Sequence, residues 1–126
     1  MIDQDTQKTN FNNVWCENGI VYYTISAPVD EKEAVRLDTV GEGFINTGEA
    51  SFVLINIEKS KEFSSSARKA WVKFLQNPKI KRTAMFGGNV FVRTLASFVI
   101  AAAGKENIKF FGTEQEALGW LHSTSS

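Results

Sequence analysis

Three consecutive serines, Ser64-Ser65-Ser66, stand at the expected start of a helix, and Arg68 follows them within one turn. The first turn of a helix presents free N–H groups and the positive end of the helix dipole, so it can hold an anion. An arginine adds a bidentate hold on phosphate or carboxylate. The simpler interpretation of this serine triplet is helix capping, in which a serine contributes about 1 kcal/mol and no ligand takes part.

A second pattern of the same kind is Gly87-Gly88-Asn89, which opens another expected helix one turn before Arg93. Asn56 lies near the end of the expected strand that precedes the serine triplet. In open α/β sheets, ligands bind beyond the carboxyl ends of the strands. If the two strands are neighbours, both helix starts converge on one anion-binding edge. A cap at Asn89 and a plain glycine turn would explain the same residues without a ligand.

Phosphorylation of Ser64, Ser65 or Ser66 by a partner kinase is a second hypothesis for the first segment. A phosphate at a helix start is stabilised by the dipole, so the modification need not unfold the domain. A bound anion and a modified serine place the same demand on the structure, because both require the helix start to be open.

Catalysis is the rival hypothesis, with Cys16 or a serine of the triplet as nucleophile. Neither has a nearby basic partner in the sequence, since the one histidine, His122, stands near the far end of the chain. The serines lack the glycine pattern of a hydrolase nucleophile elbow. No cysteine and histidine cluster has the spacing of metal ligands. We therefore expect a protein that is not an enzyme, with no cofactor and no metal.

The composition is that of a single globular domain of 126 residues, 43% hydrophobic and 22% charged. Lys plus Arg equal Asp plus Glu at 14 each, which gives no electrostatic reason to bind nucleic acid. The chain starts without an apolar signal core, and its apolar runs are too short to span a bilayer. We expect a cytoplasmic protein with a loosely ordered segment at 1–12, one domain at 13–122 and a frayed tail at 123–126.

The candidate site residues lie within a sequence whose strand and helix patterns alternate, and these elements determine their positions. The expected strands are 14–17, 20–25, 52–57, 83–86 and 108–111. The expected helices are 30–44, 64–75, 90–103 and 113–121. Asn18-Gly19, between the first two strands, is a strong hairpin signal. This order predicts an α/β fold with a mostly parallel five-stranded sheet, an antiparallel amino-terminal edge strand and four helices.

The helix at 90–103 is unusually apolar, because Arg93, Thr94 and Ser97 are its only polar residues. A surface helix normally keeps one polar side. Burial nearly all round is one explanation, and a face that meets another subunit or an apolar ligand is the other. We expect self-association, with a homodimer as the simplest product, or a regulatory protein as partner.

The carboxy-terminal pattern resembles a known family. Phe110-Phe111-Gly112-Thr113-Glu114 followed by Glu116-Ala117-Leu118-Gly119-Trp120-Leu121 is similar to the end of small bacterial SpoIIAA-like proteins, which are related to STAS (anti-sigma-factor antagonist) domains and more distantly to CRAL-TRIO lipid-binding domains. Ser66-Ala67-Arg68 and the strand Arg82-Thr83-Ala84-Met85-Phe86 fit the same family.

The resemblance implies a (β/α) superhelix with strands added in sequence and helices largely on one face. It also implies a non-catalytic binding or regulatory module, with lipid or other apolar-ligand binding of the CRAL-TRIO type as the alternative. In the antagonists a strand ends in Asp and a phosphorylated Ser opens the next helix. Here Asn56 stands near the place of that Asp, and the serine triplet near the place of the phosphoacceptor.

Overall fold

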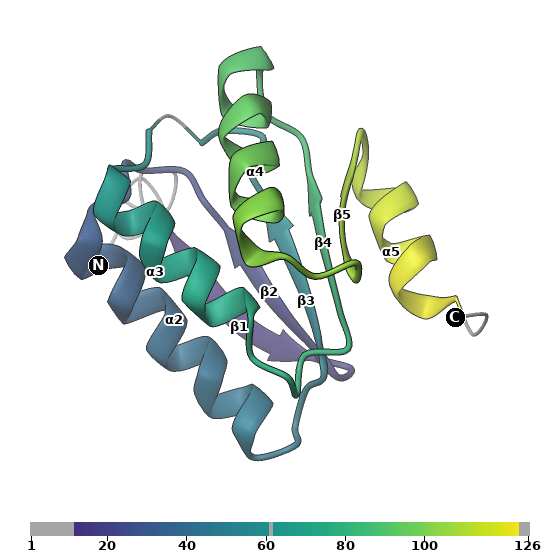
Figure 1. The fold of residues 1–126 in the computed structure, drawn as a ribbon. Helices are drawn as coiled ribbons and strands as arrows, with labels where there is room; N and C mark the ends of the chain where they lie inside the picture. Colours follow the sequence, from purple (N-terminus) through teal and green to yellow (C-terminus); the bar gives the residue numbers. More distant parts are fainter. Residues whose placement is uncertain (1–11, 61, 124–126) are drawn as a thin grey trace, which may run out of the picture.

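The computed structural model describes residues 12–60 and 62–123, and within them one five-stranded sheet organises the fold (Figure 1). The strands lie in the order of the sequence, with β1 antiparallel to β2 and the other pairs parallel. They are β1 (Asn13–Glu17), β2 (Ile20–Thr24), β3 (Phe52–Asn56), β4 (Arg82–Phe86) and β5 (Ile108–Phe111). The fold class predicted from the sequence is confirmed, and the bounds of every strand lie within one residue of those expected.

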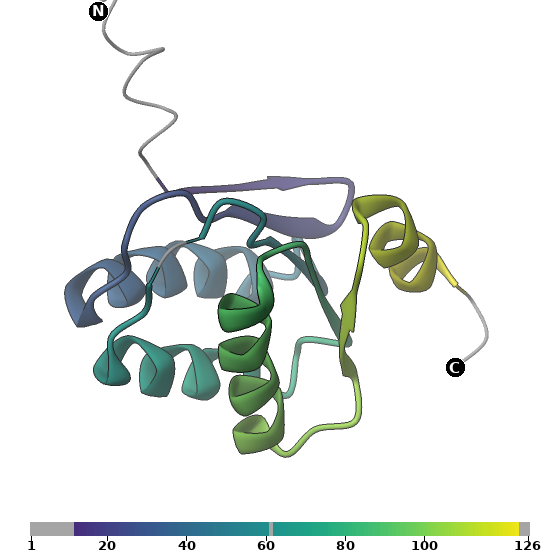
Figure 2. The ribbon, with the colours of Figure 1, turned by 90° about the horizontal axis from the view of Figure 1, so that it is seen from above.

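Four helices cover this sheet unequally. Three of them, α2 (Glu31–Asn46), α3 (Ser65–Leu75) and α4 (Val90–Ala103), pack on one face. The fourth, α5 (Glu114–His122), lies on the opposite face, as Figure 2 shows from above. Two apolar clusters result, because the side chains of a strand alternate between the two faces.

The larger core lies under α2, α3 and α4 and contains a group of edge-to-face aromatic rings. The ring centroids of Tyr23 and Trp71 are 4.9 Å apart, and those of Trp71 and Phe74 are 5.8 Å apart. The smaller core joins Ala117 and Leu121 of α5 to strand residues including Leu54. This core is smaller because a single helix, α5, covers this face, and it packs mainly on β3, β4 and β5.

The predicted turns and caps are present. Asn18 and Gly19 have φ values of 53° and 80°, the backbone of a tight hairpin turn. The side chains of Asp30, Ser64, Asn89 and Thr113 each accept a hydrogen bond from a backbone N–H in the first turn of the following helix. These caps fix where the helices begin, so local sequence and tertiary structure agree at all four starts.

Three expectations differ from the structure. Asn12, expected to be loose, is buried, and its Oδ1 accepts hydrogen bonds from the backbone N–H groups of Ser26 and Ala27 at 2.8 and 2.9 Å. Ser123, placed in the frayed tail, is also held, because its carbonyl accepts a hydrogen bond from Arg82 at 3.1 Å. The rest of the expected loose ends, 1–11 and 124–126, lies outside the described residues.

The third difference concerns α4, because burial nearly all round, one of the two explanations of its apolar sequence, is wrong. Phe98 and Val90 on this helix are 65% and 78% exposed. The helix contributes Val92, Ala96, Val99 and Ala103 to the core, which makes a single buried stripe. Its apolar outer side therefore faces solvent. Across the described part of the chain, no helix has both the length and the apolar character that crossing a bilayer requires.

Candidate functional site

The start of α3 is open, and a short backbone bridge holds it in place. Val29 and Phe63 pair as an isolated parallel bridge, and the Ser64 N–H donates to the Val29 carbonyl at 2.9 Å. Ser64 Oγ accepts from the Ala67 N–H at 3.0 Å, which is the capping role expected of it. Ser65 and Ser66 are exposed in the first turn. Capping therefore accounts for Ser64 alone and leaves the next two hydroxyl groups available.

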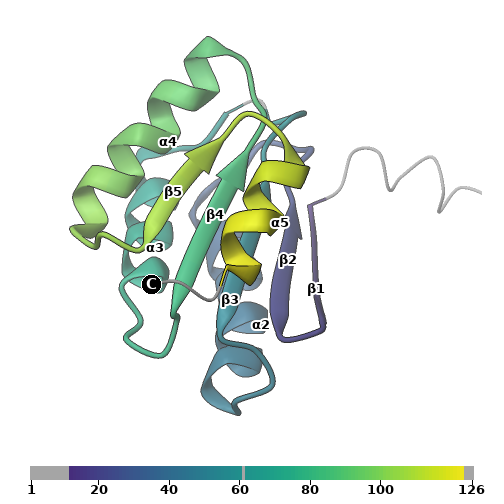
Figure 3. The ribbon, with the colours of Figure 1, turned by 90° about the vertical axis from the view of Figure 1, so that its right-hand side faces the viewer.

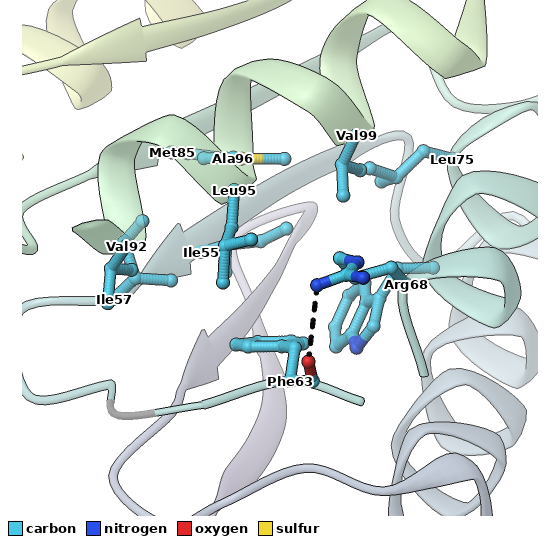
Figure 4. A pocket seen from close by; sticks show the side chains of 11 residues that line it. Ile55, Ile57, Phe63, Arg68, Leu75, Met85, Val92, Leu95, Ala96 and Val99 are labelled. Carbon is cyan, nitrogen blue, oxygen red and sulfur yellow. Dashed lines mark hydrogen bonds between the residues drawn. The ribbon is translucent and has the colours of Figure 1, made fainter. Parts of the chain in front are cut away.

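Arg68 extends from α3 into the space beneath α4, as Figure 4 shows. It is half-buried, and its Nη1 donates a long hydrogen bond of 3.4 Å to the Phe63 carbonyl. The surrounding walls are apolar and enclose about 40 Å³. This cavity has room for a few water molecules. It gives no support to the alternative of a buried lipid, since small-molecule pockets usually reach ~300 Å³ or more.

A wider groove continues outward from Arg68 between the two helices. We call it the α3–α4 groove; it measures about 310 Å³ and is lined by Ser65, Arg68, Lys69, Val72, Phe98, Val99 and Ala102. Ser65, Arg68 and Lys69 share one side of α3 because they are three and four residues apart. Sequence reasoning missed Lys69 and Phe98 as site residues. The helical spacing from Ser65 could have identified Lys69, whereas the partner face of α4 depends on the tertiary packing.

The second predicted anion site, at the start of α4, is differently arranged. Asn89 Oδ1 accepts from the Val92 N–H at 2.9 Å, so the cap is made. Gly87 and Gly88 have φ values of 88° and 89°, and a side chain at Gly87 would collide with Glu58. A carboxylate residue thus packs against the glycine turn, which is unfavourable for an approaching anion.

Arg93 does not extend toward the serine triplet. Its guanidinium lies over the ring of Phe110 on β5, with Cζ 5.1 Å from the ring centroid. The strands β3 and β4 are neighbours as expected, and the Ile57 N–H donates to the Phe86 carbonyl at 3.0 Å. The two arginines nevertheless occupy different places, Arg68 between α3 and α4 and Arg93 beside β5. The structure therefore groups Arg68 with the serines and separates Arg93 from them.

Asn56 also lies apart from the serine triplet. Its Oδ1 accepts a hydrogen bond from the Glu58 N–H at 2.9 Å, which forms a local turn at the end of β3. It shares the face of Leu54, on the side of the sheet that α5 partly covers. The amide therefore shapes the loop after β3 and borders a different hollow from the one that contains Arg68.

The candidate nucleophiles of the enzyme alternative lie on the opposite face of the sheet from His122. Cys16 is half-buried in β1, and burial, with Glu49 as a smaller cause, raises the pKa of its thiol. A thiol with a raised pKa is a weak nucleophile. His122 belongs to α5, on the far side of the sheet from the start of α3. Among residues 12–60 and 62–123 no group of His, Cys, Asp and Glu could hold a metal ion.

Comparison with known proteins gives a family without an assigned activity. The chain belongs to the family described as domain of unknown function (DUF7793), whose model matches residues 14–125. No curated protein matches the sequence.

Solved structures show the same fold at low sequence identity. An anti-sigma factor antagonist from Mycobacterium paratuberculosis has 12% identity and a TM-score of 0.70, over 90% of this chain and 94% of that one. The Bacillus cell fate determinant SpoIIAA in its phosphorylated form has 14% identity and a TM-score of 0.66, over 89% and 100%. An uncharacterised DUF3478 protein from Shewanella loihica, described as having a SpoIIAA-like fold, has 17% identity and a TM-score of 0.62, over 88% and 92%. These likenesses establish a SpoIIAA-like fold for the chain.

Proposed function

We propose that the chain is a non-catalytic regulatory module that binds a protein partner through the α3–α4 groove, with Ser65 as its point of control. The observation that carries this proposal is the shared lining of the groove. An exposed hydroxyl, two cations and an exposed aromatic ring, those of Ser65, Arg68, Lys69 and Phe98, meet on one surface. Such a surface offers an apolar anchor with a charged rim, the usual composition of a protein-binding site.

The charges indicate which partner would fit. Arg68 and Lys69 border the apolar strip, so an amphipathic segment with acidic residues beside its apolar anchor is complementary to the groove. A phosphate on Ser65 would lie within helical reach of both cations and at the positive end of α3. It would compete with an acidic partner for the same two cations, so phosphorylation would weaken binding without unfolding the domain.

Three further observations support a regulatory rather than an enzymatic role. Cys16 has a raised thiol pKa, and the Ser64 hydroxyl is occupied as a helix cap. In addition, a Bacillus protein of the same fold is described as a cell fate determinant and has a phosphorylated form. We extend that kind of control to this chain as part of the proposal, together with a cytoplasmic location.

Self-association is a second candidate, favoured by the exposed apolar side of α4. Phe98 at 65% and Val90 at 78% exposure are unusual for side chains of this kind. A homodimer through α4 would cover Phe98 and use the same groove as a partner protein. Light scattering over a range of concentrations distinguishes a homodimer from a complex with another protein, because the purified chain alone forms the dimer and the dimer dissociates on dilution. Loss of the dimer in Phe98→Gln would show that α4 forms the interface.

Site-specific photo-cross-linking tests the main proposal. A photoreactive amino acid is placed at Phe98, and in a matched control at Val35, which is 50% exposed on α2. We expect the photoreactive residue at position 98 to form a cross-link to one protein other than this chain. The cross-link should be lost when Ser65→Asp and Lys69→Gln are added. Equal cross-linking yield from position 35 would contradict the proposal, and so would a yield from position 98 that the two charge changes do not alter.

Mass spectrometry of the protein purified from its native cells locates any phosphate on Ser64, Ser65 or Ser66.

A further inference from the structure

A second hollow, unrelated to the α3–α4 groove, lies on the opposite face of the sheet. It measures about 310 Å³ and is bordered by the hairpin β1–β2 and by the start of α5. Figure 3 shows why this space is left: α5 crosses in front of β3 and β4, and β1 and β2 lie beside it without a helix of their own. Its lining reaches Thr24 and Asn56, the last residues of β2 and β3, and ligands of open α/β sheets bind at the carboxyl ends of the strands.

A stacked pair of aromatic rings forms one wall of this hollow. Trp15 and Tyr22 are register partners across β1 and β2, and their ring planes are 5° apart with centroids at 5.2 Å. Trp15 remains 41% exposed although it is the largest kind of apolar side chain. Leu54 and Phe86 of the smaller core supply apolar surface beside the pair. This side of the hollow is therefore aromatic and apolar.

Two carboxylates from distant parts of the chain are added to this lining. Glu17 ends β1 and Glu114 begins α5, and both line the hollow. Burial raises the pKa of the Tyr22 phenol, and the charges of Glu17 and then Glu114 raise it further. No lysine or arginine is among the described residues that line the hollow, and neither glutamate forms an ion pair within the described part of the chain.

We propose that this hollow binds a small organic cation, a quaternary or primary ammonium compound, on the Trp15–Tyr22 pair between Glu17 and Glu114. Aromatic faces attract ammonium groups through their quadrupole, and quaternary ammonium ligands are commonly held by aromatic side chains in this way. The carboxylates provide the opposite charge, and the apolar walls accommodate the methyl groups. An anion would meet two like charges and no cation in this lining, so the site discriminates by charge.

The experiment uses choline as the probe and its neutral isostere, 3,3-dimethylbutan-1-ol, as the matched ligand. Binding to the full chain is followed by nuclear magnetic resonance through the indole N–H signal of Trp15, with Trp71 and Trp120 as internal references. We expect choline to shift the Trp15 signal and the amide signals of Tyr22 and Glu114, and the alcohol to bind about tenfold more weakly. Equal binding of the two ligands, or shifts confined to other residues, would overturn the proposal.

Charge variants supply the second readout. The double variant Glu17→Gln with Glu114→Gln is expected to weaken choline binding about tenfold, whereas Glu31→Gln on α2, which makes the same kind of charge change away from the hollow, leaves it within about twofold. Circular dichroism verifies that each variant is folded. Unchanged affinity in the double variant would refute the site. If a lysine-containing peptide binds to this hollow and choline does not, the small-molecule assignment is refuted, and the hollow is a binding site for a protein.

Discussion

The Tyr23 side chain of β2 lies against the backbone of α2 at Gly41, and its hydroxyl donates a hydrogen bond of 3.1 Å to the Leu37 carbonyl one turn earlier. A side chain at Gly41 would collide with that hydroxyl and would also touch the Phe74 ring. The glycine therefore sets how closely α2 approaches the sheet, and it explains why a helix of 16 residues tolerates a residue of poor helix propensity at this point.

Replacing Gly41 by alanine is expected to destabilise the protein. The gain in helix propensity is ~1 kcal/mol, but overpacking against Tyr23 costs about 1–3 kcal/mol, and Tyr23 cannot move without losing its hydrogen bond. Gly43→Ala is the matched control, because it lies on the same helix with open space around it and should stabilise by about 0.5–1 kcal/mol. Urea denaturation measures both, and stabilisation by both variants would show that the close approach is not limiting.

The sequence showed this fold well because the strands and helices are locally consistent. The apolar runs, the Asn18-Gly19 turn and the four caps each predict one element, and together they fix the order. The strand order came through the family resemblance, whereas the placement of α5 on the second face came only through the structure. Gly41 shows the limit of this reasoning. A glycine within a helical pattern is compatible with close packing on the sheet or with an early helix end. The position of Tyr23 shows that close packing is the reason here.

Asp38 makes the stability of the fold depend on pH. It is 6% exposed on α2, and neither carboxylate oxygen finds a hydrogen-bond partner among the described residues. Burial, with the charge of Glu42 as a smaller cause, raises its pKa to about 8. In the unfolded chain the same group ionises near pH 4. Between these two values the folded state keeps a proton that the unfolded state has lost, so the free energy of unfolding falls as the pH rises.

Asp38→Asn is expected to remove this dependence. The wild-type free energy of unfolding should decline between about pH 4 and pH 8, by up to ~1.4 kcal/mol per pH unit, relative to the variant. The variant should therefore be the more stable protein at pH 8 and lose that advantage near pH 4. Urea titrations at several pH values measure the difference. Glu31→Gln serves as the exposed control, and parallel curves for wild type and Asp38→Asn would refute the interpretation.

The candidate site was less predictable than the fold, because its residues come together through packing. Ser65 and Arg68 are close in sequence and on one helix face, so their proximity followed from helical spacing. Arg93 was expected beside them, yet Phe110 on β5 offers its guanidinium an aromatic surface that the sequence pattern does not reveal. Phe98 and the Trp15–Tyr22 hollow depend on which surfaces the helices leave open, and that information is absent from local patterns.

Lys105 stabilises the carboxyl end of α3 from the loop after α4. Its Nζ donates hydrogen bonds to the carbonyls of Leu75 and Asn77 at 3.0 and 3.1 Å, and burial lowers the pKa of its ammonium group. Lys105→Met keeps the apolar stem but leaves those carbonyls without the donor, at an expected cost of about 1–2 kcal/mol. Lys79→Met should change stability by less than about 0.5 kcal/mol, because the Lys79 side chain is exposed and forms no hydrogen bond or ion pair with the described residues. Equal effects in thermal unfolding would show that the bonds carry no stability.

At the start of α3, Ser64 caps the helix, and Ser65 follows it as the residue for which we propose a regulatory role. Ser64→Ala should cost about 1 kcal/mol, because the Ala67 N–H loses its acceptor. Ser65→Ala should change stability by less than about 0.5 kcal/mol, since its hydroxyl is exposed in the first turn.

Ser65→Asp should instead stabilise the protein by about 0.3–1 kcal/mol, because the negative charge interacts favourably with the helix dipole and lies beside Arg68 and Lys69. High salt should remove most of that gain, and so should Lys69→Gln in the same background. A destabilised Ser65→Asp would mean that the α3 start rejects negative charge, and a phosphate on this residue could then not act as the switch.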